Sequence, residues 1–166
     1  MKICVIILVL ILLGCNSPKK KHDFIFFKWN IQESSYLKFN SSDTLYCVDA
    51  YGIKKQTSFA ILNKDQKERI EAILDTITFP KNETFEDSGI DDGQTYAFLL
   101  RDISKSNKLK IHGSAGPKRF WYLGEVLEKI TLDLQFTKTN KKIDLREIDK
   151  MVKMELPPLF VIDTLQ

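Results

Sequence analysis

The sequence predicts an α+β domain, in which an antiparallel sheet of about six strands is covered by two or three helices. Short segments rich in aromatic and β-branched residues come first, and polar turns separate them. Later segments carry apolar residues at the three-and-four spacing of a helix packed on one side. Together these patterns favour a sheet with helices packed on it.

Four strands are expected in the first part of the chain. The turn Asn40–Asp43 and the pair Tyr51-Gly52 separate neighbouring strands, because these residue types favour turns. The predicted strands are Phe24–Trp29, Tyr36–Phe39, Thr44–Ala50 and Gln56–Ile61.

A first helix is expected over Lys64–Ile77. Asn63 is a good N-cap, and Gln66 stands where a capping-box partner belongs. Pro80 ends the helix. Its apolar stripe consists of Ile70, Ile73, Leu74 and Ile77.

The next part of the chain predicts a loop, a hairpin and a second helix. An acidic, glycine-containing loop covers Lys81–Gln94, and two strands follow at Thr95–Ile103 and Lys108–His112. Gly113–Pro117 forms a turn before a helix over Lys118–Leu132. The inward residues of this helix are Leu123, Val126, Leu127 and Ile130, and Gly124 weakens it slightly.

A third helix is expected over Leu145–Met154. Asp144 is its candidate cap and Glu147 the capping-box partner. Pro157-Pro158 ends it, and Leu159–Ile162 forms a short final strand or a tail.

The order strand, turn, strand, loop, helix occurs twice, over Thr44–Ile77 and over Thr95–Ile130. The two segments are 34 and 36 residues long, but their residue identities do not match. This pattern is consistent with a duplicated ββα unit and equally with a common way of building an α+β domain.

The first fifteen residues form a secretory signal. Lys2 gives a positive end, Ile3–Leu13 is an apolar run too short to span a bilayer, and Gly14 is a small residue before Cys15. The segment Leu12-Leu13-Gly14-Cys15 resembles the lipobox of bacterial lipoproteins, a specific motif at this position although it covers only the first tenth of the chain.

This resemblance implies removal of residues 1–14 and lipidation of Cys15 by diacylglycerol and an acyl chain such as palmitate. Residues 15–23 then form a tether, and residues 24–166 form the single domain. Asn16 is not the aspartate that retains lipoproteins at the inner membrane, and the run Lys19–Lys21 is basic rather than acidic. We therefore expect a lipid anchor in the bacterial cell envelope, facing the periplasm.

The second half is also similar to small uncharacterised lipoprotein domains. In those domains a helix is followed by an aspartate-containing loop, a hairpin, a proline and another helix. Asp92, Lys110 and Pro117 stand at comparable places, whereas the cysteine motif expected before the first hairpin is absent. Such domains carry no assigned activity.

The composition of the mature chain limits its classes of partner. The removed segment contains one lysine and no acid, so 24 basic and 22 acidic residues remain and the net charge is +2. This balance argues against a general nucleic-acid binder, which needs a concentrated basic face. Once Cys4 is removed and Cys15 is lipidated, Cys47 stands alone, so no internal disulfide is expected.

Three groups of residues are candidates for cation binding, anion binding or catalysis. The acidic loop over 83–92 lacks the ligand spacing of an EF-hand, and its Asp92-Gly93 pair is typical of a turn. The segment Gly113–Arg119 places Lys118 at the start of a helix, a position that favours anion binding. A loop that only leads the chain into the helix explains this segment better. Ser114 beside His112 suggests a nucleophile and base without an identified orienting acid. The acidic residues of the loop are Glu83, Glu86, Asp87, Asp91 and Asp92.

Two further features weigh on function. Cys47 lies inside a predicted strand and is better explained as a buried thiol than as a nucleophile, and zinc is improbable with so few ligands. The consecutive rings of Phe120, Trp121 and Tyr122 sweep about 200° of a helix, so at least one is exposed or lies at an edge.

These observations favour a non-enzymatic module without a cofactor that binds an envelope protein, as an inhibitor or immunity protein does. Its candidate binding residues are Lys118, Arg119, Trp121 and Tyr122. The alternatives are a carrier of a small molecule or anion, and an envelope hydrolase built on Ser114 and His112.

Overall fold

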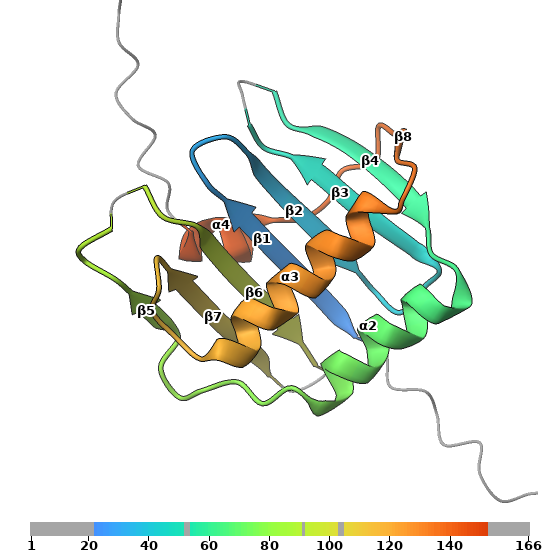
Figure 1. Cartoon of the computed structure of the whole chain (residues 1–166). Helices are drawn as coiled ribbons and strands as arrows, with labels where there is room; N and C mark the ends of the chain where they lie inside the picture. Colours follow the sequence, from blue (N-terminus) through green and yellow to red (C-terminus); the bar gives the residue numbers. More distant parts are fainter. Residues whose placement is uncertain (1–21, 52–53, 91, 103–104, 153–166) are drawn as a thin grey trace, which may run out of the picture.

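One eight-stranded sheet forms the centre of the computed structural model, which describes residues 22–51, 54–90, 92–102 and 105–152 (Figure 1). The strand order is β5-β7-β6-β1-β2-β3-β4-β8. The strands are β1 (Asp23–Trp29), β2 (Ser34–Phe39), β3 (Thr44–Asp49), β4 (Gln56–Ile61), β5 (Thr84–Glu86), β6 (Thr95–Arg101), β7 (Ser106–His112) and β8 (Thr137–Lys138).

The predicted α+β class is confirmed, but the sheet is larger than the expected six strands. The six predicted strands are all present and form its middle. The additional strands, β5 and β8, are three and two residues long and lie at the two edges. Segments this short carry too little pattern to be recognised, and tertiary contacts place them.

The sheet is built by hairpins around β1. Strands β1 to β4 form an antiparallel meander, and β6 pairs with the other side of β1. The β6–β7 hairpin extends the sheet on that side, and β5 adds a parallel pair with β7. The central strand β1 therefore joins the two halves of the sheet.

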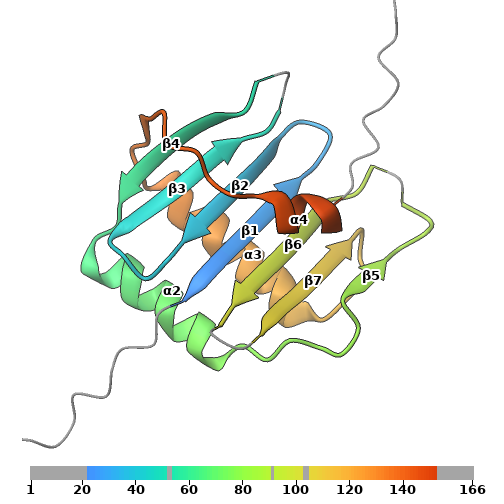
Figure 2. The ribbon, with the colours of Figure 1, turned by 180° about the vertical axis from the view of Figure 1, so that it is seen from behind.

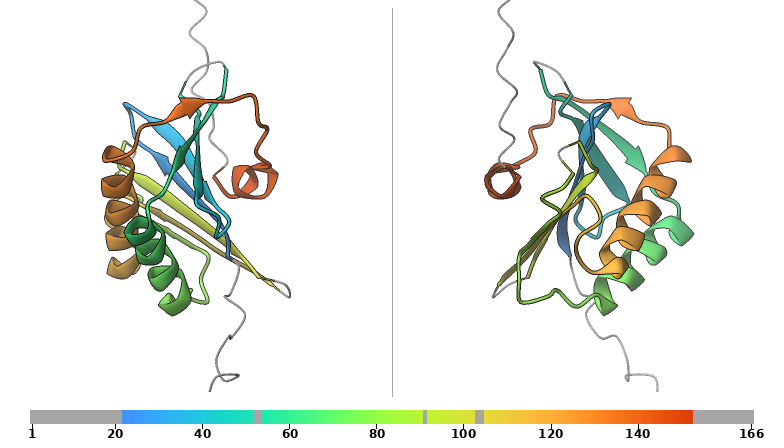
Figure 3. Two further views of the ribbon diagram at one scale, coloured as in Figure 1. Left: turned by 90° about the vertical axis from the view of Figure 1, so that its right-hand side faces the viewer. Right: turned by 60° about the vertical axis from the view of Figure 1, so that its left-hand side comes forward.

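Two helices, α2 (Lys64–Thr76) and α3 (Lys118–Leu132), cover one face of the sheet (Figures 1 and 3). The predicted cap of α2 is confirmed. The Asn63 carboxamide oxygen accepts a 2.9 Å hydrogen bond from the Gln66 amide, and the Gln66 side chain accepts a 3.0 Å bond from the Asn63 amide. The predicted bounds of α3 match the structure.

The third helix, α4 (Arg146–Met151), lies on the opposite face (Figure 2). The predicted cap is wrong: Leu145 is at the N-cap without a side-chain cap bond, and Asp144, one residue earlier, accepts a 3.1 Å bond from the Arg146 amide. Glu147 is not the capping-box partner, because its carboxylate binds Arg101 at 2.8 Å instead. The predicted helix is too long, because Leu145 and Val152 flank it rather than belong to it. Its last two predicted positions and the expected segment Leu159–Ile162 lie outside the described residues.

Alternation along the strands produces two hydrophobic cores. Phe24 and Phe26 of β1 face α2 and α3, whereas Ile25 and Phe27 face α4, and all four are at most 1% exposed. The core under α4 is closed by the buried residues Leu145, Ile148 and Val152. Burial on both sides explains why β1 is apolar without a break from Phe24 to Phe27.

Both predicted ββα runs are present, as β3-β4-α2 and β6-β7-α3. Their hairpins flank the β1–β2 pair, and both helices lie on the same face. The common origin of the two units stays a prediction.

The fold includes two residues that the sequence assigns to the tether. Asp23 is the first residue of β1, and His22 is 3% exposed. The His22 amide donates to the Ser41 hydroxyl at 2.8 Å, and its ring nitrogen Nε2 lies 3.1 Å from the Asp75 carboxylate. The folded domain therefore includes at least two residues before the predicted boundary.

Candidate functional site

The predicted anion loop and the predicted acidic loop lie against each other. Gly113 and Gly116 have φ angles of 68° and 95°, values that glycine adopts readily. A Cβ on Gly113 would lie 2.8 Å from Asp87 Cβ, and one on Gly116 would lie 2.5 Å from Ile111 Cγ2. The two glycines allow a close approach that brings both candidate regions to one end of the sheet.

Ser114 pairs with an aspartate of the acidic loop rather than with His112. Its hydroxyl donates to Asp87 Oδ2 at 2.6 Å, and this bond lowers the pKa of the Asp87 carboxyl. The bond ties the turn after β7 to the loop that follows β5. It gives both polar groups a structural role.

Both ring nitrogens of His112 are occupied by other groups. Nε2 lies 2.6 Å from the Ile90 carbonyl, which can only accept, so Nε2 carries the proton. Nδ1 then accepts from the Thr95 hydroxyl at 2.8 Å. The structure does not bring His112 and Ser114 together as base and nucleophile.

The two basic residues at the start of α3 differ in their surroundings. The Arg119 guanidinium donates to the Thr78 carbonyl and so joins α3 to the segment after α2. Lys118 is exposed. Two amides of the preceding loop are also engaged, since Gly113 donates to Gln94 and Ala115 donates to His112. These bonds leave Lys118 as the freer cation of the predicted anion site.

The three consecutive rings of α3 divide as helical geometry requires. Phe120 is fully buried, Trp121 is half-buried and Tyr122 is 63% exposed. Trp121 packs against the Tyr96 ring at 5.1 Å and donates from Nε1 to the Ala115 carbonyl at 2.8 Å. Of the two predicted binding aromatics, Tyr122 is therefore the one available to a partner.

The acidic loop is engaged with basic and hydroxyl groups. Glu86 binds Lys110 at 2.6 Å, and this pair lowers the pKa of the Glu86 carboxyl. Asp91 lies outside the described residues. Among the residues that the structure describes, no group of three or more histidine, cysteine or acidic side chains is arranged to hold a metal ion.

Cys47 of β3 is half-buried and packs against the core beneath α2 and α3. Burial, with a smaller contribution from the nearby Asp49 carboxylate, raises the pKa of its thiol to about 11. The thiol is therefore protonated at neutral pH, which fits the packing role expected from the sequence.

The sequence does not predict a polar cluster between α3 and the sheet. Glu128 of α3 accepts from the Tyr96 hydroxyl, from Gln94 at 3.0 Å and from Lys28 at 2.6 Å. Lys28 also pairs with Glu33 in the β1–β2 turn. These residues lie far apart in sequence, so no local spacing reveals them.

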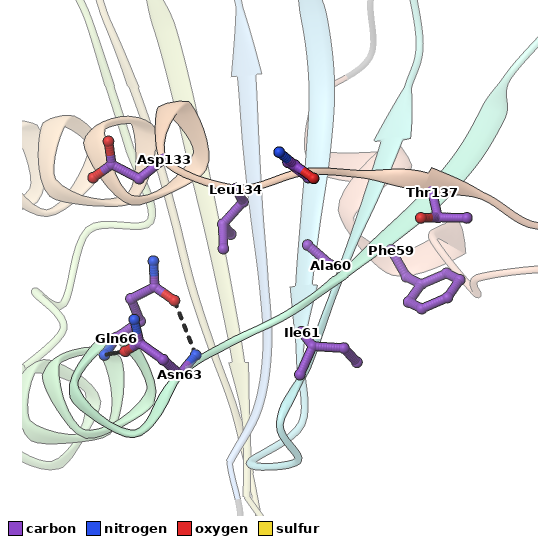
Figure 4. A pocket seen from close by; sticks show the side chains of 9 residues that line it. Phe59, Ala60, Ile61, Asn63, Gln66, Asp133, Leu134 and Thr137 are labelled. Carbon is purple, nitrogen blue, oxygen red and sulfur yellow. Dashed lines mark hydrogen bonds between the residues drawn. The ribbon is translucent and has the colours of Figure 1, made fainter.

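Two shallow hollows lie on the surface of the described residues. The larger, about 380 Å³, lies between β4, the start of α2 and the segment that follows α3 (Figure 4). The smaller, about 220 Å³, lies beside His22, Asp75 and Arg101, at the end of the sheet where the described chain begins. Neither hollow contains the predicted binding residues of α3.

No protein-family model matches the chain, and comparison with curated proteins and with solved structures finds no similar protein. None of the helices in the described segments has the length and apolar character needed to cross a bilayer.

Proposed function

We propose that this chain is a bacterial envelope lipoprotein, anchored through lipid on Cys15, that binds another envelope protein without catalysing a reaction. An inhibitor or immunity protein is the concrete form of this proposal. The lipobox-like segment ending at Cys15 supports the anchor. Two or three acyl chains would hold the protein on a membrane nearly permanently.

The observation that carries the binding role is the position of two exposed side chains relative to His22. Ile31 and Tyr51 are 65% and 58% exposed, and the Tyr51 hydroxyl donates to the Ile31 carbonyl at 3.2 Å. They lie in the β1–β2 and β3–β4 turns, at the end of the strands opposite His22. A tether before His22 would leave this apolar tip directed away from the lipid surface.

The bonds of the candidate catalytic groups also favour binding over hydrolysis. His112 is held by Thr95 and Ile90, and Ser114 is held by Asp87. A hydrolase on these residues would have to break several of these bonds before its base met its nucleophile. A protein-binding surface needs no such rearrangement.

The decisive experiment is gentle extraction of the native lipoprotein followed by identification of the proteins that remain bound. We expect one stoichiometric partner that is retained in moderate salt. Tyr51→Ala should weaken its capture, whereas Tyr122→Ala tests the surface predicted on α3. A lipidated chain that is folded and has no bound protein would contradict the proposal and favour the small-molecule carrier.

A further inference from the structure

The segment 133–145 passes the β4 edge as it connects α3 on one face of the sheet to α4 on the other (Figures 2 and 3). We call this segment the strap. Its pairing with β4 is short, because β8 has two residues and only one further bond follows, from the Thr139 amide to the Thr57 carbonyl at 3.0 Å. In the described residues, the pairing does not extend to Ile61, and the larger hollow lies beside that position (Figure 4).

Apolar side chains fasten the two ends of the strap. Leu134 and Phe136 pack against the core beneath α2 and α3, and Ile143 packs against the core beneath α4. Between these residues the contacts are polar. Both residues of β8 are exposed, and Lys141 donates to the Tyr46 hydroxyl at 2.8 Å. The strap is therefore held most weakly where it covers β4.

Strand β4 has the composition of a segment that pairs with copies of itself. Its six residues, Gln-Thr-Ser-Phe-Ala-Ile, include no charged residue, proline or glycine. Every other strand in the described parts of the chain carries at least one charged residue. Short uncharged segments with β-branched and aromatic residues associate readily when their edge is open. An uncovered β4 would therefore be a site of self-association.

The outer backbone groups of β4 are complementary to those of a second β4 that runs antiparallel to it. Leu62 donates to the Asp43 carbonyl on the β3 side. Because hydrogen-bonding direction alternates along a strand, Thr57, Phe59 and Ile61 direct their N–H and C=O groups outward. Around a two-fold axis at Phe59, Thr57 of each copy faces Ile61 of the other, and the two Phe59 rings face each other. Aromatic and β-branched pairs of this kind stabilise neighbouring strands.

We propose that the strap keeps the chain monomeric by covering β4, and that an uncovered β4 pairs antiparallel with β4 of a second copy. The occupant is a second copy because every pair across the two-fold axis comes from the side chains of β4 itself, and no like charges face each other. This inference goes beyond the proposed function, since it concerns a surface that contains neither Ile31 nor Tyr51.

The test measures self-association of the purified mature chain carrying Cys15→Ser, by sedimentation velocity over a range of concentrations. Thr137→Pro with Thr139→Pro removes the two strap amides that face β4. We expect this double variant to self-associate at least tenfold more tightly than the starting chain. Lys138→Pro is the matched control, because the Lys138 amide faces away from β4, and this variant should remain monomeric.

A further substitution identifies the edge that pairs. Phe59→Lys in the double-proline variant places two lysines opposite each other across the two-fold axis and should restore the monomer. Ile31→Lys makes the same change in charge at an exposed apolar residue outside β4, and should leave self-association unchanged. Circular dichroism checks that each variant is folded. If the double-proline variant is unfolded, Phe136→Ala replaces it, because loss of this partly buried ring also loosens the strap.

Three results would overturn the inference. One is a folded strap variant that stays monomeric although the amides of Thr57 and Phe59 exchange rapidly with solvent. Another is self-association that survives Phe59→Lys or is abolished equally by Ile31→Lys. The third is a starting chain that already self-associates and becomes monomeric with Phe59→Lys, because β4 would then pair while the strap is in place.

Discussion

Gly124 determines how closely α3 approaches the sheet at the scale of a single residue. A Cβ at this position would lie 2.3 Å from the Tyr96 ring. The same ring carries the hydroxyl that donates to Glu128, one turn further along α3. The glycine that weakens the helix therefore permits the contact that orients the polar cluster.

Gly124→Ala should lower the free energy of unfolding by about 1–3 kcal/mol, because overpacking against Tyr96 exceeds the gain in helix propensity of about 1 kcal/mol. Urea denaturation measures the change. Glu125→Ala, on the exposed side of the same helix, should be nearly neutral. A stabilised Gly124→Ala protein would contradict the close packing of α3 on Tyr96.

Buried apolar side chains also hold α4 on the sheet. Ile148 is fully buried in the core that α4 forms with β1, β2 and β6. Ile148→Ala should cost about 2–5 kcal/mol in the free energy of unfolding, through lost burial and the remaining cavity. Exposed Lys150 on the same helix provides the control, since Lys150→Ala should change stability by less than about 0.5 kcal/mol. Similar losses in both variants would argue against this packing.

At the scale of an element, α4 is held by charges as well as by its apolar side. Glu147 binds Arg101 at 2.8 Å and Lys108 at 3.0 Å, and it accepts from the Ser106 hydroxyl at 2.9 Å. These contacts, led by the Arg101 bond, lower the pKa of the Glu147 carboxyl to about 2. On the same helix, Asp149 accepts from the Tyr36 hydroxyl at 2.6 Å.

The depressed pKa predicts a pH dependence of stability. The folded state binds Glu147's proton more weakly than the unfolded state, whose carboxyl has the ordinary pKa of 4.5. The contribution of Glu147 is therefore complete above pH 4.5 and is lost as the pH falls toward 2. Glu147→Gln should lower the free energy of unfolding by about 1–3 kcal/mol at pH 7. It should also reduce the slope of the unfolding free energy against pH in this pH range.

Unfolding free energies measured at several pH values in this range check the prediction. Glu83→Gln, at an exposed position before β5, serves as the comparison and should retain the wild-type slope. An unchanged slope in Glu147→Gln would show that another carboxylate controls the acid sensitivity.

The elements differ in how well local sequence determines them. The α2 cap was predictable because Asn63 and Gln66 act within one turn. The ends of α4 were not, because Glu147 binds side chains of β6 and β7 rather than its own helix terminus. The short strand β5 likewise depends on its pairing with β7, which adjoins it only in the folded chain.

In the candidate site, too, local sequence does not determine which polar groups pair. Sequence proximity placed Ser114 near His112, yet their partners, Asp87 and Ile90, come from the loop after β5. The division of the aromatic rings in α3 was predictable because it follows from helical geometry alone. Polar partnerships across the sheet require the tertiary arrangement.

At the scale of the whole molecule, the proposed lipid anchor depends on one residue. Cys15→Ser should move the protein from the membrane fraction to a soluble fraction or leave it unprocessed, because no lipid can be added to serine. Fractionation and mass spectrometry of the amino terminus measure this. Asn16→Ala keeps the cysteine and should remain with the membrane. Membrane retention of Cys15→Ser without a lipid would contradict the anchor.

The central position of β1 has a mechanical consequence. A force applied to the chain before His22 acts first on β1, which pairs with β2 on one side and with β6 on the other. Ladder hydrogen bonds lie perpendicular to the strands, so a load carried to the opposite tip would stress both ladders in shear. Extraction of β1 would have to break them together. A protein pulled between a lipid surface and a bound partner would resist unfolding through its middle strand, whereas its two short edge strands would bear little of that force.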